Sequence, residues 1–223
     1  MTAYDKLLLL PFFQGIDRKE LEDIASRIRL DFQKYNEGER IVRANDRCKT
    51  LMLLMEGRML SEGKSADCRY SIQEYMEAPC VIEPERLFGL QQYMEREYQA
   101  LSKCVVLKLQ KDDVLRLCAE SLVFEINVLN TISTISQRDK TSFWRTPPIS
   151  IPHKIATFVA NRCVRPAGEK ILRIRLTDLG KAIGEARINV SHTIHTLEQQ
   201  GLLSFSRQTI TIYHLEKLLL IDD

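Results

Sequence analysis

The spacing of apolar residues changes along the chain. Over 17–29, Leu21, Ile24 and Ile28 recur at helical spacing and share one face, which predicts an amphipathic helix. From residue 34 the pattern becomes one of short apolar runs separated by turn residues, namely Asn36, Gly38, Asn45, Asp46 and Gly57. Further short runs follow over 68–76, 80–83 and 100–109. This alternation predicts an all-β barrel or jelly roll of about 80 residues, flanked by helices.

A helical pattern returns over 111–145. One stripe of this helix steps through Leu122, Ile126, Leu129, Ser133 and Ser136, and a second apolar row beside it holds Val128, Ile132 and Ile135. Such a wide stripe favours a helix that is buried on two sides, against its own domain and against a second copy of the chain. An ordinary core helix is the alternative. We expect a homodimer formed through residues 120–145.

Three of the seven prolines lie in "RTPPISIP", residues 145–152. Proline cannot continue a helix and restricts the residue before it, so this segment is expected to be a domain boundary or hinge. After it, the pattern predicts a helix over 153–163 and an extended segment over 170–176. These lead into "LGKAIGEARINVSHTIHTLEQQGLL", residues 179–203.

That segment predicts two short helices joined at Gly184. Thr177 is expected to cap the first helix, and Gly184 ends it because glycine adopts the left-handed conformation without a Cβ penalty. The core-facing positions are Leu179, Ala182 and Ile183 in the first helix and Val190, Ile194 and Leu197 in the second. Two helices joined by a short turn with glycine are typical of a helix-turn-helix.

The outward face of the second helix carries the candidate DNA-binding side chains. Its members are Arg187, Ile188, Asn189, Ser191, His192 and His195. A hairpin is predicted next, with strands over 203–205 and 209–213 and a turn over 206–208 that includes Arg207. A helix-turn-helix followed by a hairpin is a winged helix, whose second helix enters the major groove of double-stranded DNA. Thr177 and Arg207 complete the predicted DNA-binding set, and two packed helices without a ligand are the alternative.

Two stretches of the chain together resemble the Crp/Fnr family, the bacterial cAMP receptor protein and its relatives. "LGKAIGEARINVSHTIHTLEQQGLLS" is similar to the family's helix-turn-helix without a gap, through its glycine turn, Arg187, Val190, Leu197-Glu198 and the "GLLS" exit. "KYNEGERIVRANDRCKTLMLLMEGRM" is similar to the sensor-domain pattern, with Asn45 in place of the usual glycine. The resemblance implies an α+β fold with a cyclic-nucleotide-binding-like β-barrel (jelly roll), a long dimerisation helix and a C-terminal winged helix-turn-helix. It also implies a homodimer that reads a pseudo-palindromic operator, contacts RNA polymerase and can bind a small-molecule effector.

The effector segment departs from the family pattern. Glu83-Pro84 stand where a glycine–glutamate pair is expected, and Arg96 is followed by Glu97 where the family has serine or threonine. Pro84 removes a backbone N–H donor, and the nearby acids repel a phosphate. We therefore expect that the effector, still unknown, is not cAMP. The cysteine cluster of the oxygen-sensing relatives is also absent, so no iron–sulfur cofactor is expected.

The charge and cysteine content of the chain say less about its function than these motifs do. From Arg145 onward the chain has 11 Lys/Arg against 7 Asp/Glu, a net charge of +4, whereas the remainder carries 21 against 23. A mildly basic C-terminal third suggests an anionic partner for that third. The six cysteines show no C-x-x-C pair, which argues against a structural zinc site or a disulfide scaffold and favours buried thiols over a redox-sensing pair.

No enzyme signature stands out, because the chain shows no Ser/His/Asp grouping, glycine-rich phosphate loop or carboxylate pair. His192 and His195 lack a third ligand at useful spacing, so we expect no metal site there. No apolar run approaches the roughly 20 residues that span a bilayer, and no secretory signal is recognised. We expect a cytoplasmic protein without a membrane partner.

These patterns predict a sensor domain over 1–118, a dimerisation helix over 119–146 and a winged helix-turn-helix domain over 147–223. The predicted function is that of a sequence-specific, homodimeric transcription regulator with no cofactor. The alternative is a sensor or interaction protein of the same fold that does not bind specific DNA, its helix-turn-helix serving only for packing.

Overall fold

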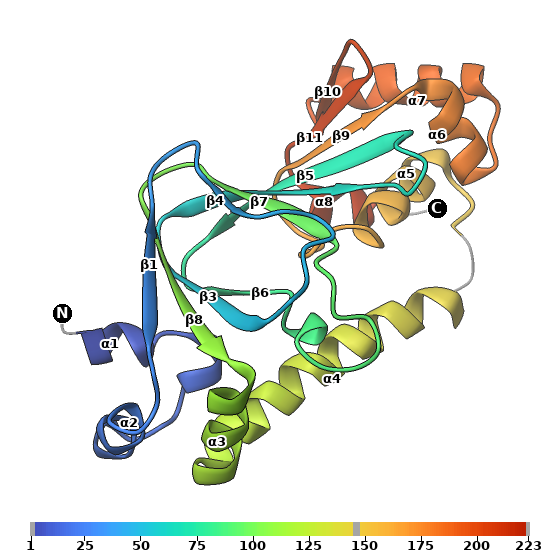
Figure 1. The fold of residues 1–223 in the computed structure, drawn as a ribbon. Helices are drawn as coiled ribbons and strands as arrows, with labels where there is room; N and C mark the ends of the chain where they lie inside the picture. The colour runs from blue at the N-terminus through green and yellow to red at the C-terminus, as the bar shows by residue number, and fades with distance from the viewer. Residues whose placement is uncertain (1–2, 145–147, 222–223) are drawn as a thin grey trace. The chain divides into compact units, whose positions relative to one another are not determined.

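The computed structural model describes residues 3–144 and 148–221 and divides the chain into two compact units (Figure 1). The first unit takes the chain up to Leu60 and then Met76–Lys140. The second takes Ser61–Tyr75 together with the chain from Thr141 onward. The second unit therefore contains a short segment that the sequence alone assigns to the β-rich region.

The first unit begins with three short helical elements, α1 (Ala3–Leu7), η1 (Pro11–Phe13) and α2 (Arg18–Ala25). Helix α2 starts where the pattern predicted, because the Asp17 side chain accepts a hydrogen bond from the Lys19 N–H at 3.0 Å. It ends earlier than the predicted residue 29, although Ile28 still turns into the core.

Eight strands follow, in the region that the alternating pattern predicted to be rich in β-structure. They are β1 (Asp31–Tyr35), β2 (Arg40–Val42), β3 (Thr50–Glu56), β4 (Arg58–Lys64), β5 (Tyr70–Glu77), β6 (Cys80–Ile82), β7 (Arg96–Ala100) and β8 (Cys104–Gln110). A 3-10 turn, η2 (Pro84–Arg86), lies between β6 and β7. Asn45 has a φ of +67°, which confirms that asparagine takes the left-handed position at this turn.

The predicted barrel is not closed, and this part of the fold prediction is wrong. Strands β1, β8, β3 and β6 hydrogen-bond in that order as one four-stranded sheet, and β2 pairs antiparallel with β7 in another. In the described part of the chain the edge strands β1 and β6 have one neighbour each. Strands β6 and β2 are only three residues long, too short to complete a ladder that would close the barrel.

The helical pattern over 111–145 forms two helices and not the single one predicted. Helix α3 (Lys111–Glu120) ends at Ser121, and α4 (Leu122–Trp144) begins directly after it. Ser121 is extended, with φ −129° and ψ 108°, and its Oγ accepts a hydrogen bond from the Phe124 N–H. Serine at this position satisfies an N–H group that has no partner within the helix, which favours a new helix start.

Helix α4 has one attached face and one free face. On the attached face, Phe124 packs edge-on against Phe12 and Phe13, and the Asn127 amide donates to the Phe12 and Gln14 carbonyls. The free face exposes Leu122, Ile126 and Leu129, whose side chains are 69%, 45% and 55% accessible. Ser133 and Ser136 continue this stripe and are also exposed. The free stripe therefore follows the 4-3-4-3 spacing of a coiled-coil seam.

The second unit is a mixed layer of helices and strands. Its elements are α5 (Ile151–Ala160), β9 (Lys170–Ile174), α6 (Leu176–Ile183), α7 (Arg187–Gln199), β10 (Leu203–Ser206), β11 (Thr209–Ile212) and α8 (Leu215–Leu219). The strand order is β10-β11-β9, and the Tyr70–Glu74 part of β5 pairs antiparallel with β9. Buried side chains from α5, α6, α7 and the strands form one core.

The predicted boundary at 145–152 is described only in part. Arg145, Thr146 and Pro147 lie outside the described residues, as does the predicted end of the dimerisation helix near Arg145. Beyond them, Ser150 precedes α5, and Pro152 stands in its first turn, where a missing N–H costs no helical hydrogen bond.

Candidate nucleic-acid interface

Helices α6 and α7 are joined by a tight turn at Gly184. As predicted, Gly184 ends α6 in the left-handed conformation, with φ +71° and ψ 34°. The Glu185 N–H then donates to the Gly180 carbonyl at 2.8 Å, and the Glu185 carboxylate pairs with Lys154 of α5. These contacts fix the angle at which α7 leaves the turn.

Gly180 is a residue of this turn that the sequence reasoning missed. A Cβ on Gly180 would lie 2.6 Å from the Glu185 carbonyl oxygen, closer than any van der Waals contact allows. The helix and the turn can approach this closely only because residue 180 has no side chain. The sequence did contain a signal for this residue, namely a second glycine four residues before Gly184.

We expect Gly180→Ala to lower the free energy of unfolding by about 1–3 kcal/mol, because the added methyl group must displace backbone atoms. Ala182→Ser is the matched control, since Ala182 is exposed on the same helix, and it should stay within about 0.5 kcal/mol of the wild type. Chemical denaturation of both variants measures the difference. If Gly180→Ala and Ala182→Ser were equally stable, the close approach of Gly180 to the Glu185 carbonyl would not restrict the residue at position 180.

The start of α6 differs from the prediction. The Arg175 carbonyl already accepts from the Asp178 and Leu179 N–H groups, so the helix begins at Leu176 and Thr177 is not its cap. Thr177 is an exposed residue of the first turn. Ala182, predicted to face the core, is exposed as well, whereas Ile183 is half-buried.

Helix α7 has the two faces predicted for it. Val190, Ile194 and Leu197 are at most 2% accessible and pack into the core of the second unit. The other face exposes Arg187, Ile188, Asn189, His192 and His195, with Ser191 half-buried beside them. Ile188 is 71% accessible, a large apolar side chain with no cover in the described chain.

The hairpin β10–β11 packs beside α7. Its turn residues Arg207 and Gln208 have φ of +47° and +69°, as a two-residue hairpin turn requires. The Phe205 N–H donates to the Glu198 carboxylate at 2.9 Å, and the Phe205 ring lies 6.5 Å from the His195 ring. Glu198 thus ties the C-terminal part of α7 to the hairpin.

A groove of about 390 Å³ runs between the start of α6, the outer face of α7 and the hairpin. Four of the predicted residues line it, namely Thr177, Arg187, Ser191 and His195. Arg175 and Gln208 also line it, and neither was singled out from the sequence. Ile188, Asn189, His192 and Arg207 are exposed residues that do not line this groove.

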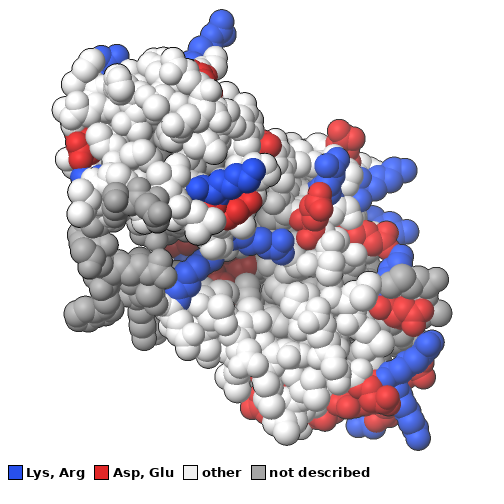
Figure 2. All heavy atoms as spheres, turned by 180° about the vertical axis from the view of Figure 1, so that it is seen from behind, with Lys and Arg blue, Asp and Glu red and all other residues white. Residues whose placement is uncertain are grey.

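The cations of this surface differ in their partners. Arg175 bonds to Asp178 through its Nε at 2.6 Å, whereas Arg187 and Arg207 form no ion pair with any described residue. On the face of the molecule that Figure 2 shows, acidic and basic side chains are interspersed and form no single basic patch. Arg187 and Arg207 are therefore cations of this surface that an anion can pair with.

The comparisons with known proteins give a fold but no close relative. No protein-family model and no curated protein matches the chain by sequence. Among solved structures, a transcriptional regulator of the Crp/Fnr family from Eubacterium rectale aligns over 95% of this chain and 98% of its own, at 17% identity and a TM-score of 0.51. The chain has the fold of a Crp/Fnr regulator.

This alignment confirms the predicted resemblance to the Crp/Fnr regulators at the level of the fold. Two further solved structures align with lower TM-scores. The catabolite activator protein of Thermus thermophilus is 16% identical, with 94% of this chain and 98% of that chain aligned and a TM-score of 0.48. FixK2 of Bradyrhizobium japonicum is 15% identical, with 88% and 98% aligned and a TM-score of 0.49.

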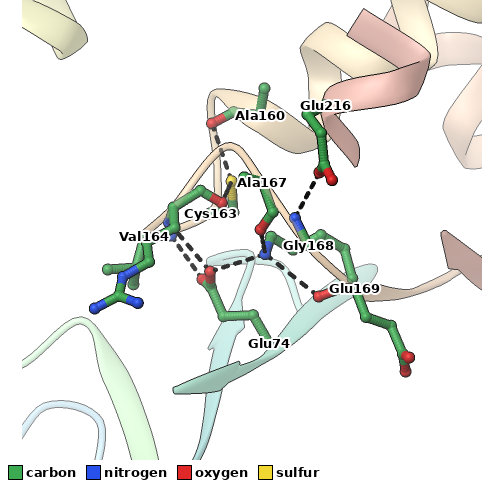
Figure 3. A network of polar contacts seen from close by, with 10 residues as sticks. Glu74, Ala160, Cys163, Val164, Ala167, Gly168, Glu169 and Glu216 are labelled. Atoms are coloured by element: carbon green, nitrogen blue, oxygen red, sulfur yellow. Dashed lines mark hydrogen bonds and ion pairs between the residues drawn. The ribbon is translucent and has the colours of Figure 1, made fainter. Parts of the chain in front are cut away.

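Within this Crp/Fnr fold, a buried acid of β5 holds the loop that leads to β9 (Figure 3). Glu74 is 2% accessible, and its carboxylate accepts from the Val164 and Arg165 N–H groups at 2.6 and 3.2 Å. It also lies 3.5 Å from the Lys170 ammonium, which is itself 3% accessible. Lys170 donates in addition to the Ala167 carbonyl at 2.7 Å. The pair is therefore satisfied on both sides, as buried charges require.

The described part of the Crp/Fnr-like chain contains no group of three His, Cys, Asp or Glu side chains arranged to hold a metal ion. His195 instead lies 3.6 Å from Glu198, and His192 is exposed. Burial raises the pKa of the Cys48, Cys104 and Cys118 thiols, which lowers their thiolate fraction and their reactivity. None of the described helices is both long and apolar enough to cross a membrane.

Proposed function

We propose that the protein is a cytoplasmic, sequence-specific DNA-binding transcription regulator that acts as a homodimer. In this proposal residues 1–118 form a sensor domain, 119–146 a dimerisation helix and 147–223 a winged helix-turn-helix domain. The observation that carries the proposal is the outer face of α7, which presents an arginine, polar side chains and an isoleucine to solvent beside a groove. The protein has no catalytic role and needs no cofactor in this account.

Helix α7 enters the major groove with its N-terminal end toward the base edges. Arg187 pairs with the O6 and N7 atoms of a guanine, and Ile188 contacts a thymine methyl group. The hydrogen-bonding side chains nearby reach bases or phosphates, namely Asn189, Ser191, His192 and His195. Thr177 and Arg207 contact the phosphate backbone on either side of α7.

Two copies joined through α4 place their α7 helices one helical turn of DNA apart, about 34 Å, on a pseudo-palindromic operator. RNA polymerase is a further partner, and a small molecule other than cAMP is the proposed class of effector. The departure of Glu83-Pro84 and Arg96-Glu97 from the cyclic-nucleotide pattern supports the exclusion of cAMP.

A sensor or interaction protein without specific DNA binding is the second candidate. The exposed Ile188 favours it, because an exposed apolar residue in the first turn of α7 can also contact a protein partner. Those Crp/Fnr regulators that read DNA with a glutamate and an arginine carry them at the positions of Ile188 and His192, so their operator does not transfer to this chain.

Selection of binding sites from random double-stranded DNA separates the two candidates. The wild type should enrich one pseudo-palindrome. Arg187→Ala should lose the preference for one G·C pair in each half-site, and Ile188→Ala the preference for one T·A pair, each a loss of about 1–3 kcal/mol of discrimination. Gln199→Ala, at an exposed position in the last turn of α7, is the matched control.

Unchanged sequence preferences in both Arg187→Ala and Ile188→Ala would remove α7 from base readout. No enriched sequence with the wild type would favour the interaction protein, provided that the same preparation is folded and dimeric.

A further inference from the structure

The first unit contains a buried carboxylate held by three donors at one point. Glu83, between β6 and η2, is 8% accessible. Its two carboxylate oxygens accept from the Glu95 N–H at 2.7 Å, from the Arg96 N–H at 3.1 Å and from the Tyr98 hydroxyl at 3.0 Å. Tyr98 is fully buried, so its hydroxyl is fixed by the core.

Three such donors form a general site for an oxyanion. Successive backbone N–H groups that point to the same side make an anion-binding concavity, and a hydroxyl adds a third hydrogen bond. Removal of a carboxylate from water is costly, and burial is the largest influence on Glu83 and raises the pKa of its carboxyl group. The three donors act in the opposite direction and stabilise the charged form.

The backbone at Glu83 is arranged around this contact. Its φ of +36° is in the left-handed region, which a residue with a Cβ avoids, and Pro84 follows immediately. An unfavourable backbone conformation persists only where the surrounding contacts determine it. In this turn, the contacts that do so include the hydrogen bonds of the Glu83 carboxylate.

We propose that Glu83 is a built-in ligand, whose carboxylate fills an oxyanion site made by the Glu95 N–H, the Arg96 N–H and the Tyr98 hydroxyl. The natural chain therefore takes no small anion at this point, and the loop between β6 and β7 is held in place without one. Once the side chain is removed, the site accepts the oxygens of a free carboxylate or phosphate. The proposal concerns the first unit alone and does not depend on DNA binding.

Glu83→Gly is the most informative change, because glycine adopts the φ of +36° without a Cβ penalty. The variant loses the carboxylate and keeps the backbone. Acetate is the first probe, since it has the same carboxylate on one carbon, and inorganic phosphate is the second. Thermal unfolding is followed as each salt replaces sodium chloride at constant ionic strength and pH.

In Glu83→Gly we expect the melting temperature to be lower than in the wild type and to rise in a saturable way with acetate, as binding to the folded state requires. The wild type and Glu85→Ala, a change of the neighbouring acid, should show no saturable response to acetate. Tyr98→Phe added to Glu83→Gly should weaken the acetate response by roughly 2- to 12-fold, the loss of one hydrogen bond. A response to phosphate as well would show that the site accepts both oxyanions, and a response to acetate alone would restrict it to carboxylates.

If Glu83→Gly is unfolded in chloride, acetate should restore its cooperative transition. Two results would overturn the proposal. One is an identical transition of Glu83→Gly in acetate, phosphate and chloride, which would make Glu83 a simple loop contact. The other is a saturable response of the wild type, which would mean that the site is open in the natural chain.

Discussion

The double variant Ile126→Glu/Leu129→Glu should be monomeric and should lose roughly 100- to 10,000-fold in affinity for a two-half-site operator. Ile126 and Leu129 lie on the free face of α4, and both are about half exposed in the single chain. Glutamates that meet across a two-fold axis repel one another and cannot be desolvated cheaply. Each half-site must then be bound independently by one DNA-binding domain. The affinity gained by joining two such domains is lost.

Sedimentation measures the assembly, and fluorescence anisotropy with labelled operator measures the affinity. Thr134→Glu is the matched control, because Thr134 is exposed on α4 and lies well away from the stripe around the helix. This control should remain dimeric. A dimer of full strength in the double variant would show that the α4 stripe is not the interface.

Replacement of the buried acid of β5 is expected to have the largest effect on stability. Glu74→Ala should lower the free energy of unfolding by about 3–5 kcal/mol, since it leaves the Lys170 charge buried without its partner. It also removes the acceptor of the Val164 and Arg165 N–H groups. Denaturant unfolding of the purified variant measures the loss.

Two further variants separate charge from packing. Glu77→Ala, at an exposed position of the same strand, should change stability by no more than about 0.5 kcal/mol. Adding Lys170→Met to Glu74→Ala should recover part of the loss, because no buried charge is then left unpaired. If Glu74→Ala alone were as stable as the wild type, the network of Figure 3 would not hold this unit together.

The second unit was predictable wherever local periodicity decides the structure. The stripe of Val190, Ile194 and Leu197 gave the core face of α7, and Gly184 gave the end of α6. The same kind of local signal was present at Ser121 and was overlooked there. Apolar spacing continues across that residue and favoured one helix, whereas the capping hydrogen bond to Phe124 starts a new one.

Features that depend on distant partners gave no such signal. Glu74 and Lys170 are far apart in the sequence, and the pairing of β5 with β9 that brings them together follows no short-range pattern. Arg175 and Gln208 line the groove beside α7 because the hairpin folds back toward the start of α6. The local sequence indicates the outer face of one helix, but it does not indicate which residues of other elements the fold places beside that face.

The central claim is that α7 of a dimer reads specific DNA. The most direct measurement is an anisotropy titration of the full chain with its selected pseudo-palindrome and with a scrambled duplex of the same composition, at several salt concentrations. We predict binding to the pseudo-palindrome at least roughly 1,000-fold tighter than to the scrambled duplex, with affinity that falls linearly in a log–log plot against salt. Equal affinity for the two duplexes at every salt concentration would contradict the account.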